Sequence, residues 1–296
     1  MSAPSVKTPD PTSSVVQKSG TRVYAKPQHP DGSRPRRLLK NAGPPILIFA
    51  LFITLWWLLS ATIYGDQNYL LPRPLAVLQS MVDDRDLILG GLWITTKESA
   101  IGFGLAIVIG IICAVVMSLS KALERSFYPY AVLLQTVPIV AVAPVIVLWF
   151  GYNQNSVIVI AFIIALFPIL NNTLLGLNST DRNQLDLFRM HRANKLTEFL
   201  KLRFPSALPA TFAGLRISAG LSVIGAIVGE FIIGSGGEQG GLGVKVIFSQ
   251  MRMQTNLLFA EVLAATLLGF AFFIIVSWVG NLLIRSWHES AMKDGG

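Results

Sequence analysis

Side chains suited to chemistry are few in this chain, and they are scattered. Its three histidines, His29, His191 and His288, fall in different regions, and its single cysteine is Cys113. A metal site needs several such ligands held together, and one cysteine cannot form a disulfide within a chain. We therefore expect no metal site, no catalytic residues and no internal disulfide.

Ionisable residues inside long apolar stretches are the next candidates, because charge is costly in lipid and such residues are functional by default. Arg216 lies near the inner end of its stretch, where its side chain can reach the interface. Glu230 follows roughly 21 Å further along a helix, near the outer end. Contact with a transport path or gate and a packing role both remain open for these two residues. We assign only one other acidic residue, Glu261, to these stretches.

A glycine-rich segment, 234–243, precedes Lys245 and superficially resembles a phosphate-binding loop. It lacks the Gly-Lys-Ser/Thr ending that such a loop requires. We interpret the segment as a flexible loop on the outer face.

A polar, basic segment, Asp181 to Pro209, lies between two apolar stretches. Its apolar residues recur three and four positions apart, with Arg and Lys on the other face, which predicts an amphipathic helix. Pro205 and Pro209 are expected to end that helix. A helix too polar to span a membrane either docks a partner or lies on anionic lipid, and the pattern alone allows both. The apolar positions are Leu187, Met190, Leu196, Phe199 and Leu200.

The composition is that of an integral membrane protein. Hydrophobic residues make up 52% of the 296 residues and charged residues 14%, against about 25% charged in an average soluble protein. Windows of roughly 20 residues identify six apolar stretches, so an all-α protein with six transmembrane helices is predicted. The stretches are 46–63, 100–119, 127–150, 156–176, 210–234 and 257–284.

The distribution of Lys and Arg predicts the orientation. With both termini in the cytoplasm, the basic residues gather on the inner side, as the positive-inside rule requires. Topology then accounts for the net charge of +8, and no nucleic-acid partner is needed. The inner set is Arg34, Arg36, Arg37, Lys40, Lys121, Arg125, Arg182, Arg189, Arg192, Lys195, Lys201, Arg203 and Arg285, and the outer set is Arg73, Arg85, Lys97, Lys245 and Arg252.

The chain divides into a tail, a membrane domain and a short end. Residues 1–43 are rich in Pro, Ser, Lys and Arg, which predicts a disordered cytoplasmic tail. The first apolar stretch begins too late and runs too long for a signal peptide, so we expect an uncleaved anchor. We assign 44–289 to the membrane domain, with a cytoplasmic loop at 177–209, and 290–296 to a C-terminal tail.

Prolines and small residues mark two of the stretches. Pro138 and Pro144 lie in the third, where each removes a backbone hydrogen bond, so we expect a bent or broken helix that contributes to the path. Pro168 lies in the fourth. The fifth places small residues four apart, which lets helix backbones approach closely. These are Gly214, Ser218, Ser222 and Ala226, beside a Gly225–Gly229 pair; Ser218 and Ser222 are also candidates for lining the path.

The basic segment resembles the EAA loop of binding-protein-dependent ABC importer permeases. Asp186 stands at the Glu position of that motif, Leu187 and Phe188 at the two Ala positions, and Arg192 at the Gly position. Because Gly is the residue best able to take a left-handed turn, we expect Asn194 to provide the bend here. The ending 205–217 is similar to the nitrate/sulfonate/taurine branch, as are Leu-Pro-Arg-Pro at 71–74 and the proline pattern before Trp149-Phe150-Gly151.

That resemblance implies a type I importer fold, with a five-helix core and one preceding helix, in the bacterial inner membrane. It implies partners: ABC ATPase subunits that hold the ATP and Mg, a solute-binding protein that contacts the outer loops, a second copy of this chain and membrane lipid. The chain itself would bind no cofactor and carry no enzymatic activity. The loop would be the coupling helix, with ATPase contacts from Asp186, Leu187, Arg189, His191, Arg192, Lys195, Leu196 and Phe199.

The implied function is ATP-driven import of a small solute such as nitrate, taurine or another sulfonate-like anion, although relatives also carry pyrimidine-type vitamin precursors. Two other classes of membrane protein fit the sequence less well. A secondary carrier would be expected to show internal repeats and more intramembrane charges, which this chain lacks. An intramembrane protease would need a base near Ser218 or Ser222, and no apolar stretch contains a histidine.

Overall fold

The computed structural model describes residues 34–62, 70–234 and 240–293, and the side-chain surroundings of 43–62, 70–234 and 240–284. The predictions for 1–33, for 235–239 of the glycine-rich loop and for 294–296 lie outside this part. The described residues form helices and no strand, in two units, Met1–Phe52 and Ile53–Gly296, each considered by itself. The helices are α1 (Arg34–Thr62), α2 (Pro74–Asp83), α3 (Arg85–Ser118), α4 (Lys121–Thr136), α5 (Ile139–Phe150), α6 (Gln154–Asn178), α7 (Arg182–Met190), α8 (Lys195–Glu198), α9 (Phe204–Ile233), α10 (Leu242–Met251) and α11 (Thr255–Lys293).

Helix ends differ from the predicted boundaries in several places. Part of the predicted tail is helical, since α1 begins at Arg34, and α11 extends to Lys293 into the predicted C-terminal tail. The second predicted stretch, 100–119, is the later part of α3, which begins at Arg85. Polar residues before Ala100 therefore belong to the same helix as the apolar ones.

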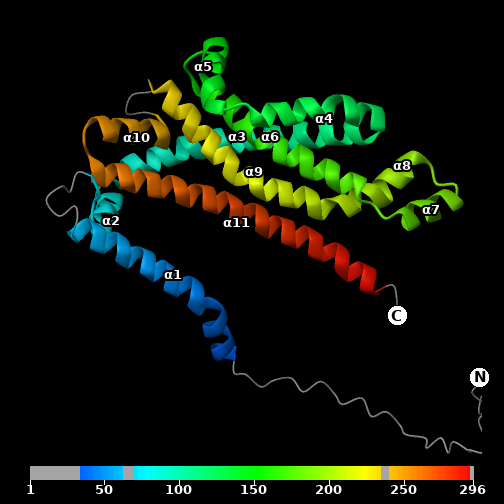
Figure 1. Cartoon of the computed structure of the whole chain (residues 1–296), viewed down its shortest axis with the longest axis horizontal. Coiled ribbons are helices and arrows are strands. Elements are labelled where there is room, and N and C mark those ends of the chain that lie inside the picture. Colours follow the sequence, from blue (N-terminus) through cyan, green and yellow to red (C-terminus); the bar gives the residue numbers. More distant parts are fainter. Residues whose placement is uncertain (1–33, 63–69, 235–239, 294–296) are drawn as a thin grey trace, which may run out of the picture. The chain divides into compact units, whose positions relative to one another are not determined.

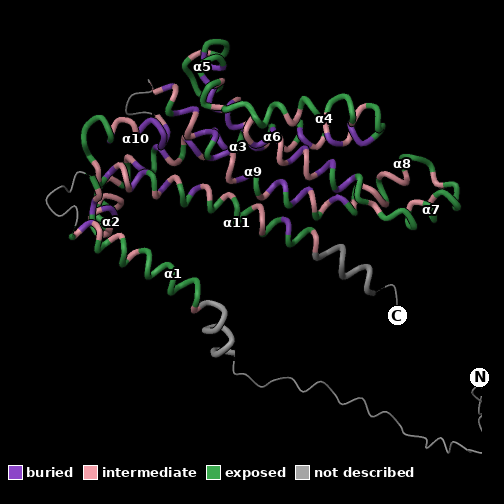
Figure 2. Tube along the Cα trace, in the orientation of Figure 1, coloured by how far each residue is buried: buried purple, intermediate pink, exposed green. Residues whose placement is uncertain are grey.

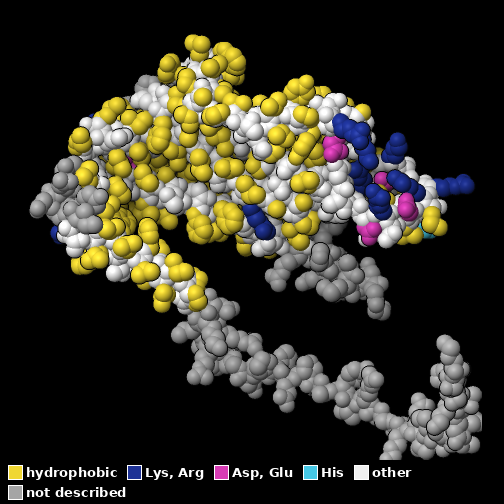
Figure 3. Space-filling view, viewed as in Figure 1, with side chains coloured by type: hydrophobic (Ala, Val, Ile, Leu, Met, Phe, Trp, Pro, Cys, Tyr) yellow, Lys and Arg dark blue, Asp and Glu magenta, His cyan; other side chains and the backbone are white. Residues whose placement is uncertain are grey.

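Five helices in the described ranges are long and apolar enough to cross a membrane, and a bent pair makes up to six. Their outward surfaces are apolar: side chains from Ile46 to Leu58 of α1 are largely exposed, as are Leu105 and Ile112 of α3. Yellow side chains cover most of the face in Figure 3. Exposed apolar side chains along helices of this length suit a lipid environment.

The core of the larger unit is formed by α3, α6, α9 and α11 (Figure 1). Buried residues concentrate along α3, α6 and α9 (Figure 2). Small residues permit this packing: a Cβ on Gly225 would lie 2.7 Å from the Cα of Ala161, and one on Gly214 would lie 2.6 Å from the carbonyl oxygen of Pro168. Gly229 faces Val157 in the same way. The small-residue face of α9 thus lies against α6.

The third predicted stretch is broken. α4 and α5 meet at an angle of 98°, and Val137 and Pro138 lie between them. Pro138 has no N–H to continue the α4 ladder, and it occupies the N-cap of α5. Pro144 lies inside α5 and Pro168 inside α6 without ending either helix.

Candidate functional site

The basic segment forms an exposed pair of short helices, α7 and α8, joined to α9 by a π-helical turn, Phe199–Arg203. Lys and Arg side chains gather at this end of the molecule (Figure 3). Each short helix has a side-chain cap: Asp181 accepts from the N–H of Asn183 at 2.9 Å, and Asn194 accepts from that of Thr197 at 2.7 Å. Such caps satisfy N–H groups that a helix start leaves unpaired.

Two expectations about this segment are wrong. It is split into two helices, and the turn between them is made by Arg192 itself, which adopts the left-handed region with φ of 51°. Asn194 has extended backbone and caps α8 instead of providing the bend. The turn is closed by the N–H of Ala193, which donates to Phe188 O at 3.0 Å. Arg192 thus occupies the conformation that the motif's glycine would favour.

The prolines also act differently from the expectation. Pro205 lies in the first turn of α9, and Pro209 lies further inside that helix. Neither proline ends the amphipathic helix. The connection is helical from Lys195 through Ile233.

Arg203 connects the basic segment to α6 through hydrogen bonds. Its guanidinium donates from Nε and Nη2 to the carbonyl oxygen of Leu177, at 3.3 and 3.2 Å, and reaches Asn178 Oδ1 at 3.5 Å. These acceptors lie at the end of α6, where backbone carbonyls lack helical partners. Thr180 and Ser206 add a hydroxyl contact at 3.3 Å. These contacts connect the segment to the end of α6 and the start of α9.

Most of the predicted coupling residues are exposed. Leu187 is 53% exposed, Met190 81% and Leu196 64%, so the apolar side of the segment has no cover from the described part of the chain. Arg189 and Asp186 form an exposed ion pair at 3.4 Å, which contributes little to stability. His191, Arg192 and Lys195 are exposed as well, whereas Phe199 is half-buried beside Phe204.

A cavity of about 460 Å³ lies at the break between α4 and α5, against α6 and α9. Pro138 lines it, with Phe167, Leu221 and Ile224 among the apolar walls and Gln135 and Thr136 supplying polar groups. None of the described residues that line it is ionisable. Its size lies within the range of pockets that hold small molecules.

The other predicted path residues lie elsewhere. Ser218 is buried and donates to Ala165 O of α6 at 2.6 Å, and buried Ser222 donates to Ala219 O. Pro144 is exposed on α5. Only Pro138 of the predicted set reaches the cavity, because the small-residue face of α9 faces α6.

Glu230 lies in a buried polar cluster at the far end of α9. Thr95 of α3 donates to its Oε1 at 2.7 Å, and the N–H of Gly243 donates to its Oε2 at 2.5 Å. The N–H of Leu242 donates to Thr95 Oγ1 at 2.8 Å. Both N–H groups belong to the first turn of α10, so α3 and α9 together cap a third helix.

Glu98 completes this cluster, and the sequence reasoning missed it. Glu98 is 3% exposed and Glu230 2%, and both side chains line the same small cavity. The apolar window began at Ala100 and therefore excluded Glu98 and Thr95. A helical projection extended by two turns would have placed Glu98 on the buried face of the helix.

Three further ionisable residues occupy partly or fully buried positions. Glu261 is fully buried and Lys245 is 7% exposed, and both line a small hollow with Ser249. The sequence analysis did not predict that α10 and α11 bring these two side chains to one hollow. Arg216 donates to Asn281 Oδ1 of α11 at 2.8 Å and so joins two helices.

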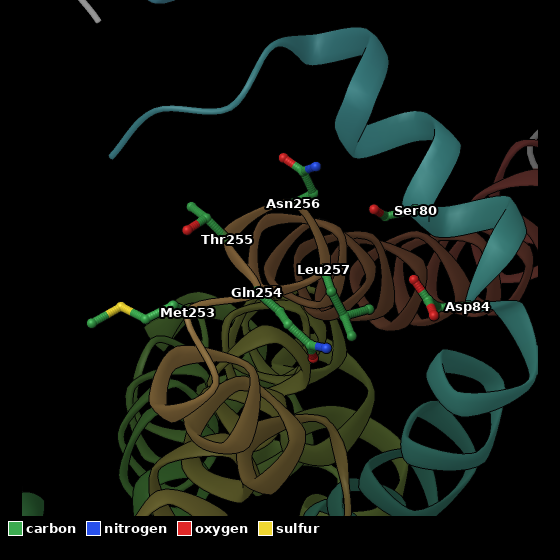
Figure 4. A pocket seen from close by; sticks show the side chains of 7 residues that line it. All are labelled: Ser80, Asp84, Met253, Gln254, Thr255, Asn256 and Leu257. Carbon is green, nitrogen blue, oxygen red and sulfur yellow. The ribbon is translucent and has the colours of Figure 1, made fainter. Parts of the chain in front are cut away.

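A separate hollow of about 440 Å³ lies between α2 and the start of α11 (Figure 4). Ser80 of α2 and Asp84, the residue that follows α2, line it on one side, and Leu257 of α11 lines it on the other. Met253, in the preceding turn, has φ of 56° and is 79% exposed, and its side chain extends away from those of Asp84 and Leu257. Polar and apolar residues both line this hollow, and no cluster of metal ligands occurs among the described residues.

Comparisons with known proteins agree on one family. Residues 106–289 match the family described as binding-protein-dependent transport system inner membrane component. The chain is 34% identical over 250 residues to a probable ABC transporter permease protein of Haemophilus influenzae, covering 84% of this chain and 98% of that one. It is 37% identical over 254 residues to the formylaminopyrimidine transport permease protein of Halalkalibacterium halodurans, covering 84% and 97%.

Solved structures show the same fold. A crystal structure of an amino acid ABC transporter with histidines superposes with a TM-score of 0.56 at 18% identity, covering 70% of this chain and 97% of that one. The MetNI methionine ABC transporter, in an inward-facing conformation, gives 0.54 at 18% identity and covers 69% and 97%.

Proposed function

Because this chain belongs to the family of binding-protein-dependent transport system inner membrane components, we propose that it couples a solute path to ATPase subunits through the basic segment. The observation that carries this proposal is the exposed apolar side of α7 and α8, joined to α6 by Arg203. Exposed apolar side chains rimmed by charge are typical of a protein interface.

The mechanism we infer is alternating access. ATP-driven closure of two ATPase subunits would move α7 and α8, and the contact between Arg203 and Leu177 would pass that motion to α6 and α9. The cavity at the α4–α5 break lies between these helices and supplies the path. ATP and the loaded binding protein shift the population toward the outward-open state only through their higher affinity for it.

We propose that two copies of this chain form the path, with both termini in the cytoplasm. The basic side chains of α7 and α8 then lie on the inner side, in agreement with the positive-inside rule. The N-terminus of α10 and the α2–α11 hollow lie on the outer side, where a solute-binding protein docks.

The substrate we propose is a small solute, with two candidate classes. Nitrate, taurine or another sulfonate-like anion is supported by relatives named as an aliphatic sulfonates permease of Bacillus subtilis and a nitrate import permease of Synechococcus elongatus. A neutral heterocycle such as a formylaminopyrimidine is supported by the 37% identity and by the absence of ionisable side chains among the described lining of the 460 Å³ cavity. Uptake of labelled nitrate, taurine and formylaminopyrimidine by proteoliposomes distinguishes the classes.

The coupling role is tested by replacing Asp186 and Arg189 together with Ala in the reconstituted importer. We expect ATP hydrolysis to lose its stimulation by the loaded binding protein and uptake to fall. Uptake driven by ATP at the unmodified rate would reject the assignment.

A further inference from the structure

Glu98 has an oxygen whose hydrogen-bonding capacity is unused. The side chain is 3% exposed, and its Oε2 has no hydrogen-bond partner in the described part of the chain. Glu230 beside it is satisfied, because Thr95 and the N–H of Gly243 donate to its two oxygens. A buried polar atom without a partner is costly, and native proteins rarely leave one.

The protonation of Glu98 and Glu230 determines which kind of ligand can hydrogen-bond to Oε2 of Glu98. Glu98 and Glu230 line the same small cavity, and two neighbouring buried carboxyl groups resist being ionised together, so we expect the pair to retain one proton. With that proton on Glu230 or on the other oxygen of Glu98, Oε2 of Glu98 is an acceptor. The two carboxyl groups then carry one negative charge, which the N-terminus of α10 partly offsets. A cationic donor is the complementary ligand.

The space in front of Glu98 limits the size of that ligand. Glu98 and Glu230 line a cavity of about 140 Å³ together with Tyr152 and Asn153, between α5 and α6, and Gln154 at the start of α6. Pockets for whole small-molecule ligands are larger, about 300–1,000 Å³. The cavity therefore suits a single head group on a narrow stem. Tyr152, which also lines the cavity, is 73% exposed, so the cavity borders the surface of the described part of the chain.

We propose that this cavity receives a Lys or Arg side chain of the docked solute-binding protein, whose N–H groups donate to Oε2 of Glu98. The assignment rests on the proposed function, which places this end of α3 and α9 on the outer side. The occupied cavity would link the docked protein to Glu230, and through it to the first turn of α10. Docking of the binding protein would thus alter the hydrogen bonds that connect α3, α9 and α10.

The test measures binding of the purified cognate solute-binding protein to the complete permease–ATPase complex in lipid nanodiscs. Glu98→Met keeps the side-chain length and removes both oxygens, and we expect its Kd to rise by about tenfold or more. Glu98→Gln keeps an acceptor oxygen and is expected to restore most of the affinity. The matched control is Asp86→Asn, which removes an exposed carboxylate from the outer end of the same helix and should leave the Kd unchanged.

A second measurement tests the proposal even if Glu98→Met prevents assembly of the permease–ATPase complex. A photo-crosslinking residue at Tyr152 should join the binding protein at a peptide that contains Lys or Arg. Two binding results would overturn the proposal: an unchanged Kd of the binding protein for an assembled Glu98→Met complex, or crosslinks from Tyr152 to lipid alone. A changed KM for the solute with an unchanged Kd of the binding protein would overturn it as well. Loss of the ATPase from the unmodified chain would instead refute the proposed function, so the two failures are distinguishable.

Discussion

The hydroxyl of Thr95 on α3 donates a 2.7 Å hydrogen bond to the carboxyl group of Glu230 on α9, although 135 positions separate the two residues in the chain. The same hydroxyl oxygen accepts the N–H of Leu242, the first residue of α10. The side chain of Thr95 therefore connects α3, α9 and α10.

Thr95→Val tests this junction because it preserves shape and removes the hydroxyl. The buried N–H of Leu242 then loses its acceptor, which costs about 1–3 kcal/mol. We expect faster hydrogen exchange at the amide of Leu242 and a lower melting temperature of the purified protein. Thr95→Ser, which retains the hydroxyl, should keep both near the original values; equal effects from Val and Ser would show that the hydroxyl is irrelevant.

Arg203→Ala removes the link between the basic segment and α6. We expect more ATP hydrolysed per solute transported, because the ATPase still docks on α7 while its motion reaches α6 less efficiently. The measurement is paired ATPase and uptake rates in proteoliposomes. Lys201→Ala, an exposed neighbour in the same turn, is the control. An unchanged ratio in the Arg203 variant would exclude this route.

The turn at Arg192 gives a third prediction. Arg192→Gly relieves a left-handed conformation that costs a side-chain-bearing residue roughly 1–2 kcal/mol, so ATPase binding should be retained or improved. Arg192→Pro fixes φ near −65°, which is incompatible with the turn, and should abolish binding. Co-purification of the ATPase with each variant is the measurement. Binding that is weakened by Gly as much as by Pro would mean that the guanidinium, and not the backbone, matters.

The close packing of α9 on α6 gives a fourth prediction. Gly225→Ala places a Cβ 2.7 Å from the Cα of Ala161, so the helices must separate, at a cost of about 1–3 kcal/mol. Gly220→Ala is the matched control, because a Cβ there has no atom within 4 Å. We expect only the Gly225 variant to lose melting temperature in detergent. A similar loss in both would indicate an effect of helix backbone freedom instead.

The sequence predicted the long helices well, because apolar length alone identifies a membrane span. It also indicated that the third stretch is bent, since Pro138 and Pro144 were visible, but the 98° angle depends on how α5 packs on α6. The basic segment was predicted as one helix because periodicity does not register a single left-handed residue such as Arg192.

The polar cluster was harder to predict. Glu230 was identified as a candidate, yet its partners lie on other helices, and pairing across helices is not encoded in local spacing. Glu98 was lost because a hydropathy window stops at polar residues, even when the helix continues through them to Arg85. Small residues suit both a path and a helix contact, so the sequence left both roles open for Ser218 and Ser222; Ser218 makes a helix contact with α6.

The most direct test of the central claim is purification of the tagged chain in detergent with mass spectrometry of what accompanies it. The account predicts a stoichiometric ATPase subunit that is lost when the exposed residues between Asp186 and Lys195 are replaced, while the chain remains folded. A chain that purifies alone, and moves solute into liposomes without ATP, would contradict the account and favour a secondary carrier.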